Sequence, residues 1–227
     1  MALTYRALSR LLSYPEVELQ TDAHTCVDVV REEGLVPGPI VRSLGKLADH
    51  LMGLDLYEAQ AAYVDLFDRT RSVSLHLYEH VHGESRERGP AMVGLVELYK
   101  SHGLEMDVSD LPDYLPVFLE FLSVIPDQEA ASLIGEAAHV LEAIAQRLKK
   151  RKSPYRAIFG ALLAVSDQPA DQAAVDSLLA IEDDDPSDLE ALDKSWEEDP
   201  ITFGPGAAKE GCPKADAMLA KIEGVQP

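Results

Sequence analysis

The chain has 227 residues, of which 46% are hydrophobic, and its formal net charge at pH 7 is −20. This length and apolar content suffice for one large domain with a buried core, which excludes a chain that is disordered throughout. The negative charge argues against binding to nucleic acid or anionic lipid and favours a basic or cationic partner. The two cysteines, Cys26 and Cys212, lie far apart, so neither a disulfide framework nor a thiolate zinc site can be built from them.

The N-terminal residues MALTYRALSRLL do not have the pattern of a signal peptide. Arg6 and Arg10 interrupt their apolar periodicity, and no cleavage site of small residues follows. No stretch approaches the ~20 apolar residues that a membrane-spanning helix requires. We therefore expect a cytoplasmic protein that does not insert directly into a membrane.

The first part of the chain is predicted to be helical. Apolar residues spaced by three and four predict helices over residues 5–13, 17–33 and 40–52, and Pro15 and Gly34 mark the ends of the first two.

A fourth helix is expected to begin near Asp55, because Asp55 and Glu58 stand in capping-box register. It should carry Tyr63, Leu66 and Phe67 inward.

Residues 69–87, RTRSVSLHLYEHVHGESRE, show no helical stripe. Apolar and polar residues instead alternate from Leu75 to His82, which is typical of an extended segment. We expect a polar connecting segment here.

The remaining residues return to helical spacing. Helices are expected over residues 90–103, 111–125, 127–151, 153–165 and 169–181. The RLKKRK run near the end of the third of these, residues 127–151, complements the helix dipole, which is reason enough for its charge. After residue 181 the sequence is acidic and rich in turn residues, and only residues 189–196 have modest helical character. The sequence therefore predicts an all-α, single-domain helical bundle over 1–181 and an irregular, acidic, flexible tail over 182–227.

One short motif raises the possibility of a metal site. His76, Glu79 and His80 in HLYEH match the H-x-x-E-H spacing of the inverted zinc peptidases, in which two His hold zinc and the Glu activates water. Gly83 and the serines before the motif would leave the helix that must present the pair short and poorly supported. The alternative is a polar loop in which these side chains are satisfied by backbone and by Arg86 or Arg88.

Other catalytic patterns are missing from the sequence. No Ser lies in a G-x-S-x-G elbow, and Gly34, Gly38 and Gly45 match neither phosphate-binding pattern. The acidic runs near residues 183–185 and 197–198 are most simply solvated charge.

A longer resemblance covers most of the chain. The segments YVDLFDRTRSVSLHLYEHVHGESRERGPAMVGLVELYKSHGL and DLPDYLPVFLEFLS closely resemble the nitrate reductase molybdenum cofactor assembly chaperones, within the TorD/DmsD/NarJ group of redox-enzyme maturation chaperones. The opening YRALSRLLSYP and the late ALDKSWEEDPITFGPG are similar to the same family.

The resemblance implies an all-helical chaperone that is not an enzyme and holds no stably bound cofactor. Such proteins bind the apo catalytic (alpha) subunit of the respiratory nitrate reductase, including its N-terminal segment. They hold it back until molybdenum cofactor and iron-sulfur clusters are inserted, before membrane assembly. Proteins that deliver the molybdenum cofactor are further expected partners.

Two hallmark patches of the group can be carried over by residue. An aromatic-x-x-Leu-Phe motif matches Tyr63, Leu66 and Phe67. The second, Glu-Pro-x-Asp-His, falls on residues 110–114, where only Asp113 is identical in place. Tyr114 stands where the group often has His, so a proton-dependent role of that His is not implied here.

These patches suggest a groove for an amphipathic peptide that carries a basic residue. An aromatic floor and an acidic rim are expected, and the floor residues would be Tyr63, Phe67, Tyr114, Phe118 and Phe121. The rim carboxylates would be Asp68, Glu79, Asp113 and Glu120. With Leu66, Arg69 and His80 added, these are the expected client-binding residues. The alternative is that the apolar members are ordinary core residues at helical spacing.

Two rival functions remain open at this point. One is a zinc-dependent hydrolase that uses the motif at 76–80, and the other is a helical adaptor for a different ligand of an acidic groove. Metal content separates the first from a chaperone, and the identity of a co-purifying partner separates the second.

Overall fold

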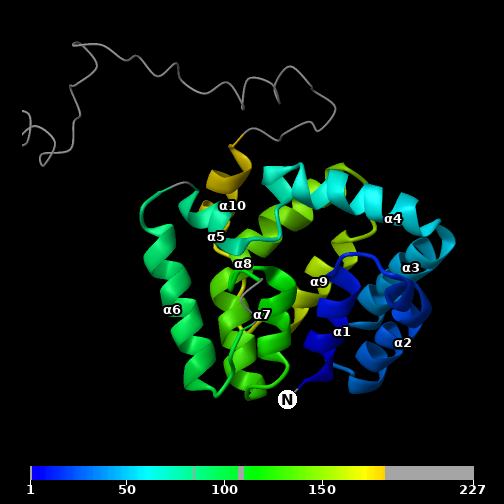
Figure 1. Ribbon diagram of the computed structural model, residues 1–227, viewed down its shortest axis with the longest axis horizontal. Helices are drawn as coiled ribbons and strands as arrows, with labels where there is room; N and C mark the ends of the chain where they lie inside the picture. The colour runs from blue at the N-terminus through cyan, green and yellow to red at the C-terminus, as the bar shows by residue number, and fades with distance from the viewer. Residues whose placement is uncertain (1, 84, 107–109, 182–227) are drawn as a thin grey trace, which may run out of the picture. The chain divides into compact units, whose positions relative to one another are not determined.

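The computed structural model describes residues 2–83, 85–106 and 110–181. Within these ranges the regular structure consists of ten α-helices, two short helices of other types and one isolated β-bridge (Figure 1). The α-helices are α1 (Leu3–Leu12), α2 (Val17–Glu33), α3 (Gly38–Gly53), α4 (Leu56–Tyr63), α5 (Leu77–His82), α6 (Arg88–Ser101), α7 (Leu115–Leu122), α8 (Asp127–Lys150), α9 (Arg156–Val165) and α10 (Gln172–Leu179). The predicted all-α fold is confirmed, whereas the predictions for 182–227 lie outside the described residues.

The helix ends have the local causes that the sequence indicates. Asp55 caps α4, because its side-chain oxygen accepts a hydrogen bond from the backbone N–H of Tyr57 at 2.9 Å. Gly34 follows α2 with φ of 73°, a left-handed conformation that glycine adopts without strain. After α4 the chain continues into a π-helical turn, η1 (Val64–Asp68).

The expectation of an extended connection over 69–87 is largely wrong. A 3-10 turn, η2 (Arg71–Val73), and the six-residue helix α5 occupy this stretch, and only the backbone around His76 is bridged to another strand-like residue, Tyr114. The helix expected over 111–125 is shorter than predicted and begins at Leu115. The residues before it form a turn that contains Tyr114, the partner of His76 in the bridge. Long-range hydrogen bonds therefore override the local pattern at both places.

The core is built around α1. Its residues Leu8, Leu11 and Leu12 are fully buried, and α1 packs against α2, α7 and α9. The hydroxyl of Ser9 donates to the carbonyl of Pro116 at 2.8 Å, so a polar contact also joins α1 to α7. Figure 1 shows α2, α3 and α4 on one side of this core and α5 and α6 on the other.

The longest helix, α8, forms the other half of the core and packs against α9 and α10. No helix in the described ranges is both long enough and apolar enough to cross a membrane.

A tyrosine hydroxyl connects α4 to α1 in the interior. Tyr63 is 3% exposed, and its hydroxyl lies 2.9 Å from the Leu12 carbonyl, to which it donates, and 3.0 Å from the Tyr114 hydroxyl. We expect Tyr63→Phe to lower the free energy of unfolding by about 1–2 kcal/mol, because the carbonyl of the buried Leu12 loses this hydrogen-bond donor. The matched control is Tyr57→Phe on the same helix, whose side chain is 79% exposed. Urea unfolding that gives equal values for the two variants would contradict this role.

Candidate functional site

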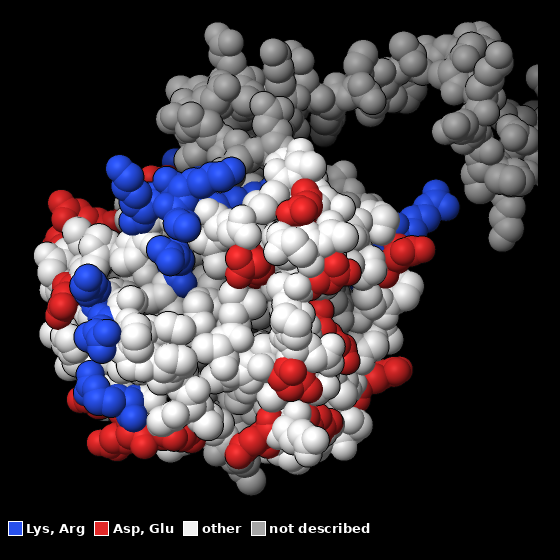
Figure 2. All heavy atoms as spheres, turned by 180° about the vertical axis from the view of Figure 1, so that it is seen from behind, with Lys and Arg blue, Asp and Glu red and all other residues white. Residues whose placement is uncertain are grey.

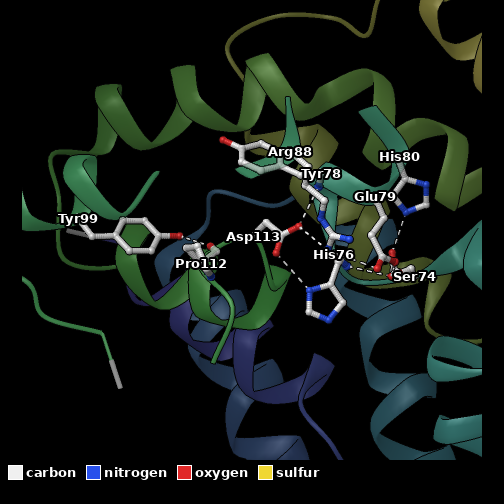
Figure 3. Close-up of polar contacts among 9 residues, drawn as sticks. All are labelled: Ser74, His76, Tyr78, Glu79, His80, Arg88, Tyr99, Pro112 and Asp113. Atoms are coloured by element: carbon white, nitrogen blue, oxygen red, sulfur yellow. Dashed lines mark hydrogen bonds and ion pairs between the residues drawn. The ribbon is translucent and has the colours of Figure 1, made fainter. Parts of the chain in front are cut away.

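A buried carboxylate organises the polar centre of the protein. Asp113, in the turn before α7, has no exposed surface. Its Oδ2 accepts a hydrogen bond from the backbone N–H of Tyr78 at 3.1 Å, and its Oδ1 lies 3.2 Å from Nδ1 of His76 (Figure 3). The guanidinium of Arg88 is 3.8 Å from Oδ2. Burying a carboxylate is costly unless it is paired and hydrogen-bonded, and these groups meet that requirement.

The same turn is joined to the His76 segment by backbone hydrogen bonds. The N–H of Leu77 donates to the Asp113 carbonyl at 3.0 Å, and the N–H of Leu115 donates to the Leu75 carbonyl at 2.8 Å. Asp113 therefore fixes α5 to the start of α7 through both its backbone and its side chain.

Ser74 holds the residues of the HLYEH motif in place. Its hydroxyl donates to Glu79 Oε2 at 2.6 Å and accepts from the backbone N–H of His76 at 3.2 Å. The Ser74 carbonyl lies 2.9 Å from Nε2 of His80. Arg88, 3.4 Å from Glu79 Oε1, joins Glu79 to the Asp113 cluster.

This arrangement does not support the zinc hydrolase hypothesis. His76 precedes α5 rather than lying on it, so His76 and His80 do not share a helical face. His76 faces Asp113, Glu79 faces Ser74 and Arg88, and His80 faces a backbone carbonyl (Figure 3). Among the described residues no group of three His, Cys, Asp or Glu side chains is arranged to hold a metal ion.

The two histidines have opposite electrostatic environments. The hydrogen bond to Asp113 is the main reason that the pKa of His76 is raised, and burial opposes it. Burial lowers the pKa of His80, against the hydrogen bond to Ser74. His76 therefore favours the charged form and His80 the neutral form.

Tyr114 lies beside His76. Their ring centroids are 5.3 Å apart, and the Tyr114 hydroxyl reaches Tyr63. The imidazole of His76 thus reaches both Tyr114 and the neighbouring Asp113 from another segment of the chain. Asp68 lies near both residues. Burial raises the pKa of Asp68, and the nearby His76 opposes this shift. The charge of Asp68 in turn adds to the raised pKa of Tyr114, whose main cause is burial.

Four of the five residues expected to form the groove floor are buried in this structure. Tyr63, Phe67, Phe118 and Phe121 are 3–5% exposed and belong to the hydrophobic core. Asp113 is also fully buried, so the expectation that it stands on a rim is wrong.

The other expected residues reach the surface to different degrees. Asp68, Arg69 and Glu120 are exposed, and Arg69 pairs with Asp65 at 3.0 Å. The half-buried members are Leu66, Glu79, His80 and Tyr114.

A cavity of about 370 Å³ lies between α1, α6, α7, residues 104–106 and Asp110. Glu120 and Phe121 are the only expected residues among its lining side chains. The residues that sequence reasoning missed are Arg6, Tyr99, Leu104, Glu105, Met106, Asp110, Val117, Ser123 and Val124. Apolar residues of α7 such as Val117 could have indicated one wall of this cavity from the sequence. The opposite walls come from α1 and residues 104–106, and only the tertiary fold brings these segments next to α7.

The cavity combines an apolar wall with an acidic edge. Apolar atoms come from residues such as Leu104, Met106 and Val117, whereas Glu105, Asp110 and Glu120 are exposed. These three carboxylates outnumber the one cationic side chain of the lining, the exposed Arg6. The hydroxyl of Tyr99, at its wall, donates to the Pro112 carbonyl at 2.7 Å, which connects the cavity to the turn that carries Asp113 (Figure 3). Such a site suits an apolar side chain that has a cationic group beside it.

The fold belongs to a known class of helical proteins. A crystal structure of a candidate redox enzyme maturation protein from Archaeoglobus fulgidus has the same fold, with a TM-score of 0.51 and 22% sequence identity. The similarity covers 71% of this chain and 91% of that chain.

The sequence comparisons define the family. Residues 37–161 match the family model described as the nitrate reductase delta subunit. The nitrate reductase molybdenum cofactor assembly chaperone NarJ of Escherichia coli (strain K12) is 39% identical over 207 residues, which are 90% of this chain and 85% of that protein. NarW of the same strain, named as a candidate chaperone of the same kind, is 35% identical over 198 residues, covering 87% and 82%.

The chain therefore belongs to the nitrate reductase delta subunit family. The resemblance found in residues 63–104 and 110–123 is confirmed. The relatives are assembly chaperones rather than enzymes, and this is the class to which the protein belongs.

The His76 contact predicts a pH-dependent contribution to stability. Because the folded pKa of His76 is raised, the contribution is fully present below its unfolded pKa of 6.5 and is lost as the pH rises through the folded pKa. His76→Gln should therefore lower the free energy of unfolding more at pH 5.5 than at pH 8.5. Urea titrations of both proteins across this range measure the difference, and a difference that does not change with pH would rule out the charged contact.

Proposed function

We propose that this protein binds the apo catalytic (alpha) subunit of a respiratory nitrate reductase and promotes insertion of its cofactors. It holds the N-terminal segment of that client in the cytoplasm until molybdenum cofactor and iron-sulfur clusters are in place, before membrane assembly. Membership of a family of molybdenum cofactor assembly chaperones supports this role.

The observation that carries the proposal is the acid-edged cavity between α1, α6 and α7. Its volume of about 370 Å³ is in the range of small-ligand pockets and accommodates one or two apolar side chains of a peptide. An amphipathic helix places such side chains three or four residues apart, and a basic residue beside them would face Glu105 or Glu120.

The proposed client surface continues from the cavity along the turn at residues 110–114. Asp110 lines the cavity, Leu111 is 48% exposed, and Tyr114 lies at the other end beside His76 and Asp68. The surface thus alternates apolar and acidic groups over the segment that carries the family motif. An amphipathic peptide with basic residues complements this order of groups.

The residues expected from the sequence then divide into two roles. Those proposed to touch the client are Leu66, Asp68, Arg69, Glu79, His80, Tyr114 and Glu120. Those proposed to hold this surface in position are Tyr63, Phe67, Asp113 and Phe118, whereas Phe121 lines the cavity and is proposed to touch the client there. Cofactor delivery proteins would meet the client while it is held in this complex, and the chaperone itself keeps no cofactor.

Calorimetric titration of a synthetic peptide with the client's N-terminal sequence tests the proposal. We expect binding at low salt that weakens when salt is added, because exposed charges on the two partners are screened. Absence of binding at both salt concentrations would refute the peptide-holding mechanism.

The acidic edge of the cavity gives a sharper prediction. Glu105→Gln combined with Glu120→Gln should weaken peptide binding about 3- to 10-fold at low salt and reduce its salt dependence, since each exposed ion pair contributes modestly. The control is Glu97→Gln, an exposed carboxylate of α6 that does not line the cavity. Equal affinities for the double variant and the control would place the peptide elsewhere.

Asp68 tests the other end of the proposed surface. Asp68→Asn should also weaken binding, but by a smaller factor of about 2 to 5, because Asp68 contributes one exposed charge. The control for this change is Asp65→Asn, one turn earlier, where the carboxylate already pairs with Arg69 at 3.0 Å. If Asp65→Asn weakens binding more than Asp68→Asn does, the surface does not extend to His76.

A further inference from the structure

The basic residues of this acidic chain are concentrated in one place. Residues 147–156 include six of the 20 Lys and Arg residues and no Asp or Glu, and the nearest carboxylates in the sequence are Glu142 and Asp167. These basic residues are Arg147, Lys149, Lys150, Arg151, Lys152 and Arg156. They occupy the last turn of α8, the residues that follow it and the start of α9.

A residue from an earlier part of the chain joins them. The end of α8 lies against η2, because Arg147 Nη1 donates to the Ser72 carbonyl at 2.8 Å and Arg151 Nη2 donates to the Ser72 hydroxyl at 3.4 Å. Arg71, next to Ser72, is exposed. We call the exposed members of this group the basic surface, and they are Arg71, Lys149, Lys150, Lys152 and Arg156.

Figure 2 shows a dense cluster of Lys and Arg side chains on one face of the protein, whereas Asp and Glu are spread over other parts of that face. In the described ranges, no carboxylate forms an ion pair with Lys149, Lys150, Lys152 or Arg156.

The dipole of α8 explains only part of this cluster. A helix C-terminus attracts cations within its last turn, which accounts for Lys149 and Lys150. Lys152 and Arg156 lie beyond the end of α8, and Arg71 comes from η2. Like charges gathered in this way repel one another, so an anionic partner would stabilise the surface.

A buried arginine holds the end of α10 close to the basic surface. Arg147 is 3% exposed, and its Nη2 donates to the carbonyls of Leu178 at 2.7 Å and of Ile181 at 3.1 Å. The end of α10 and the last described residue are thereby tied to the last turn of α8. The next four residues in the sequence, Glu182 to Asp185, are all acidic.

We propose that the acidic segment Glu182–Asp185 of this chain docks on the basic surface. Four residues span at most about 13 Å, whereas Lys150, three residues after Arg147, lies on a neighbouring face of α8 and only about 5 Å farther along the helix axis. The segment therefore reaches the surface without a linker, and its effective concentration exceeds that of any separate acidic partner. Docking neutralises the basic surface and leaves the acid-edged cavity as the place to which a basic segment is attracted.

Zero-length carbodiimide cross-linking of the full chain, read by mass spectrometry, tests the contact. Amide links should join residues 182–185 to Lys149, Lys150 or Lys152 at least fivefold more often than to Lys46 or Lys100, and 0.5 M NaCl should reduce them. Lys46 and Lys100 are exposed residues of α3 and α6 and act as internal controls. Equal linking to all five lysines, or no linking to the basic surface, would overturn the proposal.

The same experiment on an equal mixture of unlabelled and nitrogen-15-labelled protein identifies the occupant. Links within one chain contain a single isotope, as expected for the chain's own segment. Mixed pairs in statistical proportion would show that a second copy occupies the surface and would overturn the proposal.

Tryptic cleavage after Lys152 gives an independent measurement on variants. A combined Asp183→Asn, Asp184→Asn and Asp185→Asn variant should be cut there several-fold faster than the native chain, because the docked segment no longer covers the site. The control removes the same charge farther along, by Asp188→Asn, Asp193→Asn and Asp199→Asn, and should leave the rate unchanged. Equal rates for both triple variants would contradict docking by residues 182–185.

Discussion

The structure depends on the burial of one carboxylate. Asp113 is removed from water at the junction of two segments that are far apart in the sequence, and a carboxylate in that position must be given hydrogen-bond donors. The backbone N–H of Tyr78, the imidazole of His76 and the guanidinium of Arg88 meet this need. All three donors belong to the stretch from η2 to α6. The need of the Asp113 carboxylate for hydrogen-bond donors therefore determines how this stretch packs against α7. A buried polar cluster of this kind specifies an arrangement more sharply than apolar packing does.

The cavity follows from this arrangement. Asp113 fixes the turn at residues 110–114, and the Tyr99 hydroxyl reaches the Pro112 carbonyl in the same turn, so α6 is held at a defined place beside α7. Side chains of α1, α6 and α7 can then enclose an apolar space whose edge carries Glu105, Asp110 and Glu120. Phe121 forms part of the wall, and the ring of Phe118 packs beside it in the core. The turn at residues 110–114 therefore acts through its structural effect on the surface that we propose for the client.

The sequence predicts the fold well and the site only in part. Helical spacing, the cap at Asp55 and the left-handed Gly34 are local signals, and they place most helices correctly. The alternation from Leu75 to His82 indicates an extended segment locally, but Ser74 and Asp113 instead hold it as a bridge followed by α5. The apolar spacing of α7 is the same whether its residues form the floor of a groove or part of the core. The structure shows that Phe118 is buried in the core. The cavity needs Arg6 and residues 104–106 together, which only the tertiary fold provides.

Hydrogen–deuterium exchange of the full chain, with and without a peptide of the client's N-terminal sequence, tests the central claim most directly. The account predicts slower exchange on peptide binding in residues 104–106 and 110–124, with a smaller effect at 74–80, because the Asp113 cluster connects these segments. Residues of α2 and α3 should be unaffected. Protection confined to α2 and α3, with none around the turn at 110–114, would contradict the claim that this surface holds the client.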